Sequence, residues 1–374
     1  MKNIRVAIAG GGTGGHVYPA LNLAAIIKEN WNAQFLFFGT RRGLESTKVP
    51  AAGYPLVLLP VAGIQRRVTL SNLLVPFKLW KSMNICRQKL KEFQPHLVIG
   101  TGGYVMGPVL RTAQKMSIPT ILQEQNSYPG ITTRSLAGRA DRVLLAYEEA
   151  KSFFKRQDNL VVTGNPVVLP EVAESKQELQ KAFGLQPDVL TVLIFGGSQG
   201  AASINRAMAQ IVQQKDFREG VQFIWQTGQR DFERYREQAE RQGWANVRLF
   251  AYIEPMARAY KAADLAVCRA GAMTLSELMA AGLPAILIPY PYAAADHQTR
   301  NAEALQDKNA ALIIEDNDHL PQSLREALKT VLDNRRLIET MRQKIRELHR
   351  PQTARLIRDQ IQEVLKEHYA ATDD

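Results

Sequence analysis

The sequence predicts an α/β protein built from two doubly wound units, each with a parallel sheet. The first observation is an alternation of short Val/Ile/Leu-rich runs with longer helical patterns along all 374 residues. Apolar runs without strict alternation are typical of parallel strands that helices cover on both faces. The second observation is a coarse duplication, because AIAGGGTGG (7–15) resembles LIFGGSQG (193–200) and LVIGTGGYV (97–105) resembles LAVCRAGAMT (265–274). Two Rossmann-type units in tandem explain both observations.

The expected strands fall into two groups. The first group is IRVAIAG, QFLFFG, HLVIGTGG, PTILQEQN and RVLLAY, and the second is LTVLIFGG, QFIWQTG, VRLFAYI, LAVCRAG, PAILIPYP and AALIIED. Between them, GNPVVLPE (164–171) contains two prolines and a glycine, which favours a linker. We therefore expect domains over 1–164 and 165–352. Residues 353–368 carry apolar side chains at helical spacing, and we expect this helix to pack back on the first domain.

Composition limits the kinds of partner. The formal net charge of +11 favours anionic ligands or surfaces. A nucleic-acid partner is disfavoured, because aromatic residues make up only 7% and no basic segment is interleaved with them. Two cysteines without CxxC spacing predict neither a disulfide framework nor a zinc site, which suits a reducing compartment. No charge-free stretch reaches the ~20 residues that a membrane span needs, so we expect a protein in solution or on a membrane surface.

The glycine turns predict anion binding. Gly10, Gly12 and Gly15 follow the first strand as GxGxxG, where backbone N–H groups and a helix N-terminus can face an anion. An NAD site would also place an acid near the end of the second strand to bind the ribose. Arg41 and Arg42 stand there instead, which disfavours NAD and leaves an NADP-dependent oxidoreductase as an alternative.

Two stretches carry polar side chains suited to catalysis or sugar binding. His16 opens the first helix, where the helix dipole disfavours the imidazolium and favours a neutral base. In residues 268–302, the hydroxyls of Thr274 and Ser276 could hold a diphosphate, and Glu277 could accept hydrogen bonds from a ribose. Farther on, Asp296, His297, Gln298 and Asn301 form a polar cluster that suits sugar hydroxyls.

Seven motifs occur in an order that resembles one family. They are GGTGGHVYPAL, GTGGYVMGP, LQEQNSYPG, GNPV, FGGSQGA, RAGAMTLSEL and DHQTRNA. Together they resemble the MurG family of glycosyltransferases over essentially the whole chain. The resemblance implies a GT-B fold, with two Rossmann-like domains facing a deep cleft. It also implies inverting transfer of N-acetylglucosamine (GlcNAc) from UDP-GlcNAc to the 4-hydroxyl of the muramic acid in lipid I (undecaprenyl-diphosphate-MurNAc-pentapeptide), which gives lipid II for peptidoglycan synthesis.

The resemblance also assigns residues. The first domain would bind the acceptor, with His16 as the catalytic base and Glu124 as the alternative base. The implied UDP-GlcNAc contacts of the first domain are Thr13, Gly14, Gly15 and Asn126. Those of the second domain are Ser198 at the diphosphate, Ile253 at the uracil through its backbone, Ala272, Met273, Thr274, Leu275 and Ser276 at the diphosphate, Glu277 at the ribose, and Gln298 at the GlcNAc. Val168 stands where relatives usually have an arginine, for which Arg269 is a candidate replacement.

A membrane surface is the remaining implied partner, because the acceptor carries a polyprenyl chain. Residues 63–83 mix cations with apolar side chains, which suits an anionic bilayer at the cytoplasmic face of the bacterial plasma membrane. The expected membrane contacts are Leu73, Leu74, Phe77, Lys78, Trp80 and Lys81. Other cell-wall synthesis proteins are further candidate partners. No metal site is expected, because Asp316-Asn317-Asp318 fits a turn and helix start, although a divalent cation stays an open alternative. A glycosyltransferase of the same fold that acts on a different lipid acceptor also stays an open alternative.

Overall fold

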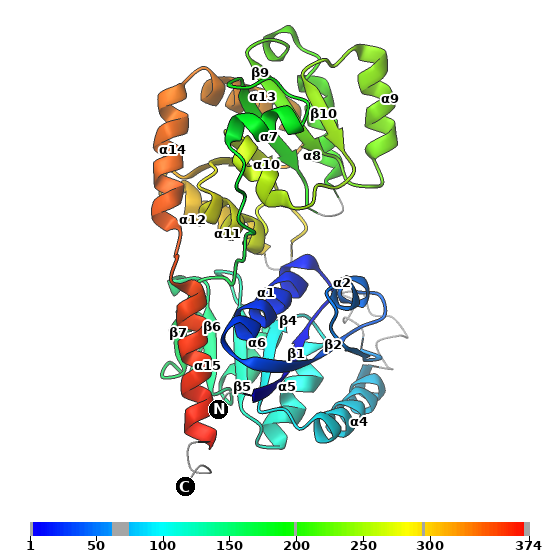
Figure 1. Cartoon of the computed structure of the whole chain (residues 1–374), viewed down its shortest axis with the longest axis vertical. Coiled ribbons are helices and arrows are strands. Elements are labelled where there is room, and N and C mark those ends of the chain that lie inside the picture. The colour runs from blue at the N-terminus through cyan, green and yellow to red at the C-terminus, as the bar shows by residue number, and fades with distance from the viewer. Residues whose placement is uncertain (1–2, 62–74, 198–199, 294–295, 370–374) are drawn as a thin grey trace. The chain divides into compact units, whose positions relative to one another are not determined.

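The computed structural model describes residues 3–61, 75–197, 200–293 and 296–369. The chain divides into two compact units, one of residues 1–168 with 351–374 and one of residues 169–350. The division therefore follows Val168 and Arg350, a few residues from the boundaries at 164/165 and 352/353 that we expected from the sequence. Both units are coloured along the chain in Figure 1.

The first unit is a parallel sheet in the order β3-β2-β1-β4-β5-β6-β7. Its strands are β1 (Asn3–Gly10), β2 (Asn32–Gly39), β3 (Leu56–Leu58), β4 (Leu97–Gly102), β5 (Thr120–Glu124), β6 (Arg142–Leu145) and β7 (Leu160–Val162). Its helices are α1 (Gly14–Asn30), α2 (Glu45–Ala51), α4 (Val75–Phe93), α5 (Met106–Lys115), α6 (Ile131–Ala137), the 3-10 helix η1 (Glu148–Phe153) and α15 (Thr353–Tyr369). Strand order reverses between β1 and β4, the point of such sheets where ligands bind beyond the carboxyl ends.

The second unit is also parallel, in the order β10-β9-β8-β11-β12-β13. Its strands are β8 (Leu190–Phe195), β9 (Val221–Gln226), β10 (Val247–Phe250), β11 (Leu265–Cys268), β12 (Ala285–Leu287) and β13 (Ala311–Ile313). Its helices are α7 (Lys176–Ala182), α8 (Ala202–Ile211), the 3-10 helix η2 (Lys215–Phe217), α9 (Phe232–Gln242), α10 (Met256–Ala262), α11 (Ala272–Ala281), α12 (His297–Gln306), α13 (Leu320–Leu332) and α14 (Arg335–Leu348). The prediction of two doubly wound parallel sheets is confirmed.

Both sheets are buried on both faces, which explains the apolar runs in the sequence. In β1, Val6 and Ile8 pack into one core cluster while Ala7 and Ala9 pack into another. In β8, Val192 and Ile194 face one layer of helices and Leu193 faces the other. Successive side chains of a strand point to opposite faces, so a strand between two helical layers has no position for a solvated side chain.

Helix α15 belongs to the first unit. Its apolar face, with Ile357, Ile361 and Val364, is fully buried against the first sheet and α1. Figure 1 shows α15 in red beside β6 and β7. Polar contacts secure both of its ends: Thr353 Oγ1 donates to the carbonyl of Thr163 at 2.7 Å, and His368 Nε2 lies 2.8 Å from a carboxylate oxygen of Asp141. The chain therefore returns to the first unit after completing the second.

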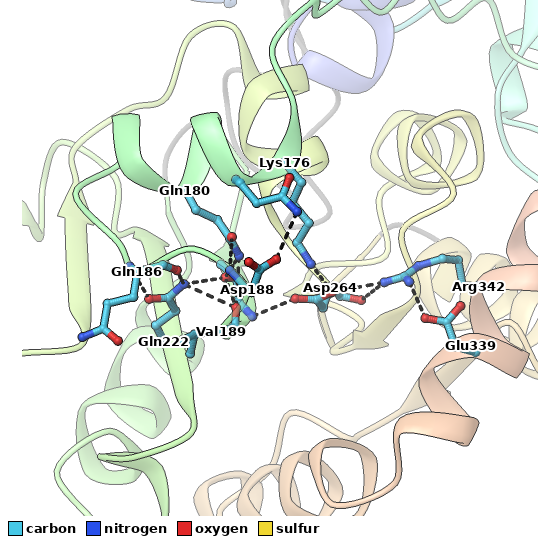
Figure 2. Close-up of polar contacts among 11 residues, drawn as sticks. Lys176, Gln180, Gln186, Asp188, Val189, Gln222, Asp264, Glu339 and Arg342 are labelled. Atoms are coloured by element: carbon cyan, nitrogen blue, oxygen red, sulfur yellow. Dashed lines mark hydrogen bonds and ion pairs between the residues drawn. The ribbon is translucent and has the colours of Figure 1, made fainter.

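A buried carboxylate ties three elements of the second unit together. Asp264, 6% exposed, lies at the start of β11 and accepts a hydrogen bond of 2.9 Å from the N–H of Thr191 in β8. The other carboxylate oxygen, Oδ1, pairs with Lys176 of α7 and lies 3.4 Å from the guanidinium of Arg342 of α14. Figure 2 shows the two cations approaching Asp264 from opposite sides. This network therefore lies at the amino edge of the sheet, away from the ligand edge.

Two glutamines extend the network at this edge. The side-chain amides of Gln180 and Gln222 donate to Thr191 Oγ1 at 2.8 and 3.0 Å, respectively. Gln180 accepts from the N–H of Asp188, and Gln222 accepts from the N–H of Gln186. Buried amides with both ends satisfied fix the loop before β8.

We expect Asp264→Ala to lower the free energy of unfolding by about 2–3 kcal/mol, since it leaves the Thr191 N–H without its acceptor and removes the carboxylate that pairs with Lys176 and Arg342. Lys176 stays partly exposed, which keeps the loss below that of a fully buried pair. Asp333→Ala, which removes an exposed carboxylate 3.7 Å from Lys329, is the matched control and should cost less than about 0.5 kcal/mol. Urea unfolding measures both, and equal losses would contradict this role for Asp264.

Candidate functional site

The first glycine turn, between β1 and α1, is built around a buried carboxylate. Glu45 opens α2 and is fully buried. One carboxylate oxygen accepts from the N–H of Gly12 at 2.8 Å, and the other accepts from the N–H and hydroxyl of Thr40 at 2.7 and 2.8 Å. A Cβ on Gly11 or Gly43 would lie 2.4 or 2.1 Å from this carboxylate. The absence of side chains at those positions is therefore what makes room for Glu45.

A second glycine turn, after β4, packs against the first and holds His16. A Cβ on Gly103 would lie 2.3 Å from the carbonyl oxygen of Gly11, and one on Gly102 would lie 2.3 Å from Nδ1 of His16. Both Gly102 and Gly103 have positive φ angles, of 113° and 78°. Side chains rarely adopt such angles, so both turns require glycine for their conformation and for their close approach.

Hydrogen bonds select the tautomer of the neutral imidazole of His16. Its Nδ1 lies 3.0 Å from the carbonyl oxygen of Thr101 and 3.3 Å from Oε1 of Gln125. The side-chain nitrogen of Gln125 donates to the same Thr101 carbonyl at 2.8 Å, so Oε1 is the acceptor end of that amide. Both neighbours of Nδ1 are acceptors, so Nδ1 carries the proton and Nε2 is the basic nitrogen.

A buried network stands behind His16. Gln125 contacts the side chain of Gln123, and Gln123 donates to Oδ1 of Asn165 at 3.0 Å. Asn165 in turn donates to the carbonyl of Gln125 at 3.1 Å. All three side chains are less than a tenth exposed. The motifs LQEQN and GNPV therefore meet in the first unit, and their amides hold Gln125 against His16.

Glu124, the alternative base, organises its own loop. One oxygen accepts from the backbone N–H and the side-chain nitrogen of Asn126, both at 3.2 Å, and the other accepts from the N–H of Gly130 at 3.1 Å. The carboxylate is 3% exposed. Both oxygens thus already accept hydrogen bonds from the loop that carries Asn126.

The remaining expected ligands of the first unit lie at the start of α1. Thr13 is the N-cap residue, and its carbonyl accepts from the N–H groups of His16 and Val17, both at 3.1 Å. Gly14 and Gly15 are the first two residues of the helix. The first two N–H groups of a helix have no carbonyl partner within it, so the N–H groups of Gly14 and Gly15 can face an anion or a sugar oxygen.

In the second unit, α11 places most of the expected donor contacts. Gly271 is its N-cap, and Ala272, Met273, Thr274, Leu275, Ser276 and Glu277 follow in its first two turns. Ala272, Met273 and Leu275 are buried, whereas Thr274 is half-buried. The hydroxyl of Ser276 donates to the carbonyl of Ala272 at 2.9 Å inside the helix. The backbone of this turn, rather than the Ser276 hydroxyl, is therefore the better-placed donor group.

Glu277 lies one turn farther along α11 and pairs with a buried tyrosine. The hydroxyl of Tyr260 donates to a carboxylate oxygen of Glu277 at 2.6 Å. Burial raises the pKa of Glu277, and the hydrogen bond from Tyr260 opposes this shift. The pKa of Tyr260 is raised as well, by its own burial and then by the Glu277 charge. Tyr260 therefore orients the carboxylate as the donor of their shared hydrogen bond.

Gln226, at the end of β9, links two loops at the ligand edge. Its Oε1 accepts from the N–H of Ile253 at 2.8 Å, and its Nε2 donates to the carbonyl of Gly197 at 3.1 Å. Because the N–H of Ile253 is engaged, its carbonyl is the backbone group that could contact a base. Ser198 lies outside the described residues.

Gln298 and Arg269 lie at the carboxyl edge of the second sheet, one at the start of α12 and the other directly after β11. Gln298, in the first turn of α12, accepts from the N–H of Tyr290 at 2.9 Å, so its side-chain nitrogen is the end that could reach a sugar. The guanidinium of Arg269 lies 2.7 Å from Asp316 and donates to Ser203 at 2.9 Å. Asp316 therefore forms an ion pair with Arg269, and this pair neutralises the charge of Arg269.

Helix α4 has a buried face and an exposed aromatic face. Ser82, Cys86 and Leu90 are buried at four-residue spacing, whereas Phe77 and Trp80 are 60% and 62% exposed and their rings stack at 6.1 Å. Lys78 is half-buried and Lys81 is exposed, and Leu73 and Leu74 lie outside the described residues. Among the described residues, no helix is long and apolar enough to span a membrane.

Among the described residues, no three His, Cys, Asp or Glu side chains are grouped so that they could hold a metal ion.

Sequence reasoning missed four residues that position the site: Glu45, Thr101, Gln125 and Asn165. Thr101 and Gln125 share one signal, a polar side chain inside or directly after an apolar run, as in HLVIGTGG and TILQEQN. Such a residue must find buried partners, so the pattern could have flagged Thr101 and Gln125. Glu45 carries no such signal.

The comparisons with known proteins agree over the whole chain. The N-terminal domain of glycosyltransferase family 28 matches residues 6–145, and the C-terminal domain of that family matches residues 191–357. A Desulforamulus reducens protein named UDP-N-acetylglucosamine–N-acetylmuramyl-(pentapeptide) pyrophosphoryl-undecaprenol N-acetylglucosamine transferase is 40% identical over 93% of this chain and 95% of its own. A Phocaeicola vulgatus protein of the same name is 44% identical over 88% of each chain. The crystal structure of Acinetobacter baumannii MurG covers 97% of this chain and 100% of its own, with a TM-score of 0.76 at 30% identity.

We expect Glu45→Gln to destabilise the protein by about 1–3 kcal/mol, because the new amide would turn a donor toward the donors of Gly12 or Thr40. Glu29→Gln, an exposed site on α1, is the matched control and should change the stability by less than about 0.5 kcal/mol. Thermal and urea unfolding measure this difference. A Glu45→Gln variant as stable as the control would contradict the prediction that the Glu45 carboxylate stabilises the glycine turn.

We expect the stability of Glu277→Gln relative to the unsubstituted protein to depend on pH. The raised pKa means that the folded state binds a proton more tightly than the unfolded state, whose glutamate pKa is near the ordinary value of 4.5. Below that value the Glu277 contribution is fully present, and it is lost as pH rises toward the raised folded pKa. The variant should therefore gain relative stability over this window and level off above it. A difference that stays flat with pH would contradict the raised pKa.

Proposed function

The chain belongs to the MurG family within glycosyltransferase family 28, and we propose that it transfers GlcNAc from UDP-GlcNAc to the muramic acid of lipid I, forming lipid II. The observation that carries this proposal is the identity of 40% over nearly the full length of a relative named for that reaction. The two parallel-sheet units have the GT-B fold that the sequence predicts.

His16 is the proposed catalytic base. In an inverting transfer, the acceptor 4-hydroxyl gives its proton to the base while its oxygen attacks the anomeric carbon, and UDP leaves from the opposite face with the bonding electrons. The proton on Nδ1 of His16 is held by two acceptors, so Nε2 can take the proton from the acceptor. Glu124 fits a positioning residue instead, since both of its oxygens already hold the loop of Asn126.

The second unit is the proposed donor-binding unit. The N-terminus of α11 would face the diphosphate, where its partial positive charge stabilises the departing UDP. Glu277 would accept hydrogen bonds from the ribose, the carbonyl of Ile253 would contact the uracil, and Gln298 would contact the GlcNAc. Ser198, Thr13, Gly14, Gly15 and Asn126 complete the proposed donor contacts.

The bilayer is the proposed location of the acceptor. The exposed rings of Phe77 and Trp80, with Lys78 and Lys81 on the same helix, suit the surface of an anionic membrane. With Leu73 and Leu74, they are the proposed contacts of a peripheral protein at the cytoplasmic face of the plasma membrane.

The reaction itself is tested by mixing the full chain with radiolabelled UDP-GlcNAc and a short-chain lipid I analogue. A labelled disaccharide-lipid supports the proposed donor, acceptor and reaction class together. Binding of UDP-GlcNAc without transfer would overturn the proposed acceptor, and loss of both would overturn the function.

We expect His16→Ala to lower kcat by about 100-fold to 10,000-fold, because it removes the group that accepts the proton. The dissociation constant for UDP-GlcNAc, measured by calorimetry, should change less than about threefold. His319→Ala, an exposed histidine of the second unit, is the matched control and should keep full activity. Turnover by His16→Ala equal to the control would remove His16 as the base.

A further inference from the structure

The carboxyl end of β9 lies between two loops of the proposed nucleotide site. Gln226 is the last residue of β9, and it pairs with Phe195 at the end of β8 on one side and with Phe250 at the end of β10 on the other. The strand pairing therefore stops at the same level on both sides. The glycine turn that includes Gly197 follows β8, and the loop that includes Ile253 follows β10.

The side chain of Gln226 extends the connection beyond the strand pairing. Its Nε2 donates to the carbonyl of Gly197 at 3.1 Å, and its Oε1 accepts from the N–H of Ile253 at 2.8 Å. Gly197 lies two residues beyond the last paired residue of β8, and Ile253 lies three residues beyond that of β10. One amide thus ties together two loops that lie past the ends of their strands.

The partners of this amide determine its orientation. A carbonyl can only accept a hydrogen bond and a backbone N–H can only donate one, so Gly197 and Ile253 together admit a single orientation of the Gln226 side chain. The side chain is also 1% exposed. Because it is buried and both of its ends are engaged, Gln226 acts on a ligand through the two loops rather than by touching it.

Backbone contacts at the same strand end support both loops. A Cβ on Gly200 would lie 2.1 Å from the carbonyl oxygen of Thr227, and this carbonyl accepts from Nδ2 of Asn205 at 2.9 Å. On the other side, the N–H of Thr227 donates to the carbonyl of Phe250 at 3.0 Å. Both loops therefore take their positions from the end of β9.

We propose that Gln226 is a positioning residue for nucleotide binding, and that it sets the spacing between the loop of Ile253, which would contact the base, and the glycine turn after β8, which would face the diphosphate. The proposal rests on the function proposed above and deepens it, because it assigns the recognition of a whole nucleoside diphosphate to one buried amide. A ligand that spans both loops needs this spacing, whereas a ligand that reaches one loop does not. We therefore expect removal of the amide to weaken UDP more than uridine.

The matched control is Gln222, at the other end of the same strand. It is 3% exposed, and its amide donates to the carbonyl of Gln186 at 2.7 Å and accepts from the N–H of Gln186 at 3.0 Å. Gln226→Met and Gln222→Met each keep an unbranched side chain of similar length and leave two backbone groups without their amide partner. Urea unfolding should therefore show similar losses of stability in the two variants.

Titration calorimetry of the full chain with UDP and with uridine tests the proposal. We expect Gln226→Met to bind UDP at least about tenfold more weakly than Gln222→Met, and uridine less than about threefold more weakly. The KM for UDP-GlcNAc should rise as the UDP affinity falls, while kcat changes less than about threefold. Gln226→Asn, whose amide is one methylene shorter and cannot reach both loops, should give the same pattern and carries the test if Gln226→Met does not fold.

Three results would overturn this role of Gln226. They are a UDP affinity equal to that of the Gln222→Met control, equal losses of UDP and uridine affinity, and a failure of the unsubstituted chain to bind UDP. The last result would also overturn the proposed function. If the unsubstituted chain binds UDP but transfers no GlcNAc, the proposed function alone fails, and the calorimetry still decides the role of Gln226.

Discussion

A single carboxylate, that of Glu45, sets the shape of the glycine turn at the carboxyl edge of the first sheet. It lies where glycines leave no side chains, and it accepts the N–H of Gly12 immediately before α1 begins. Moving this carboxylate would release the turn, and with it the position of the first helical turn and of His16. Since the second glycine turn packs on Gly11, the same interaction also fixes the backbone around Gly102. The imidazole of the proposed base therefore depends on a group that need not touch a substrate.

The two units use their sheet edges differently. In the second unit, the buried Asp264 network closes the amino edge, whereas the backbone turns and Glu277 occupy the carboxyl edge. A parallel sheet makes this separation easy, because all of its strand ends of one kind lie together. The stabilising network and the proposed ligand contacts thus lie at opposite edges of one sheet. In the first unit the two roles are not separated. The stabilising carboxylate of Glu45 and the proposed base His16 both lie at the glycine turn between β1 and α1.

Sequence patterns predicted the units, the glycine turns and the position of His16 at a helix start, because each depends on residues close together in the chain. β3 and β7 were missed because their local patterns are weak: the apolar run at β7 is only LVV, and prolines flank the run PLVLLP at β3. Glu45 could not be placed because its partner Gly12 lies 33 residues away and nothing nearby distinguishes it from a helix-opening acid. Arg41 and Arg42 could be noticed as a pair, but only the fold brings them to one recess with Lys78 and Lys81.

The return of α15 to the first unit affects the order in which the chain can fold during its synthesis. Ile357, Ile361 and Val364 complete a core begun by Ile4 and Val6, so residues at opposite ends of the chain must meet. The second unit takes its core from residues 169–350 alone, so its core can close without α15. The first unit, although synthesised first, is completed last, because its core includes α15. Until α15 is made, the part of the sheet and of α1 that it covers lacks its apolar partner, so the first unit becomes fully stable only after the residues of the second unit have been synthesised.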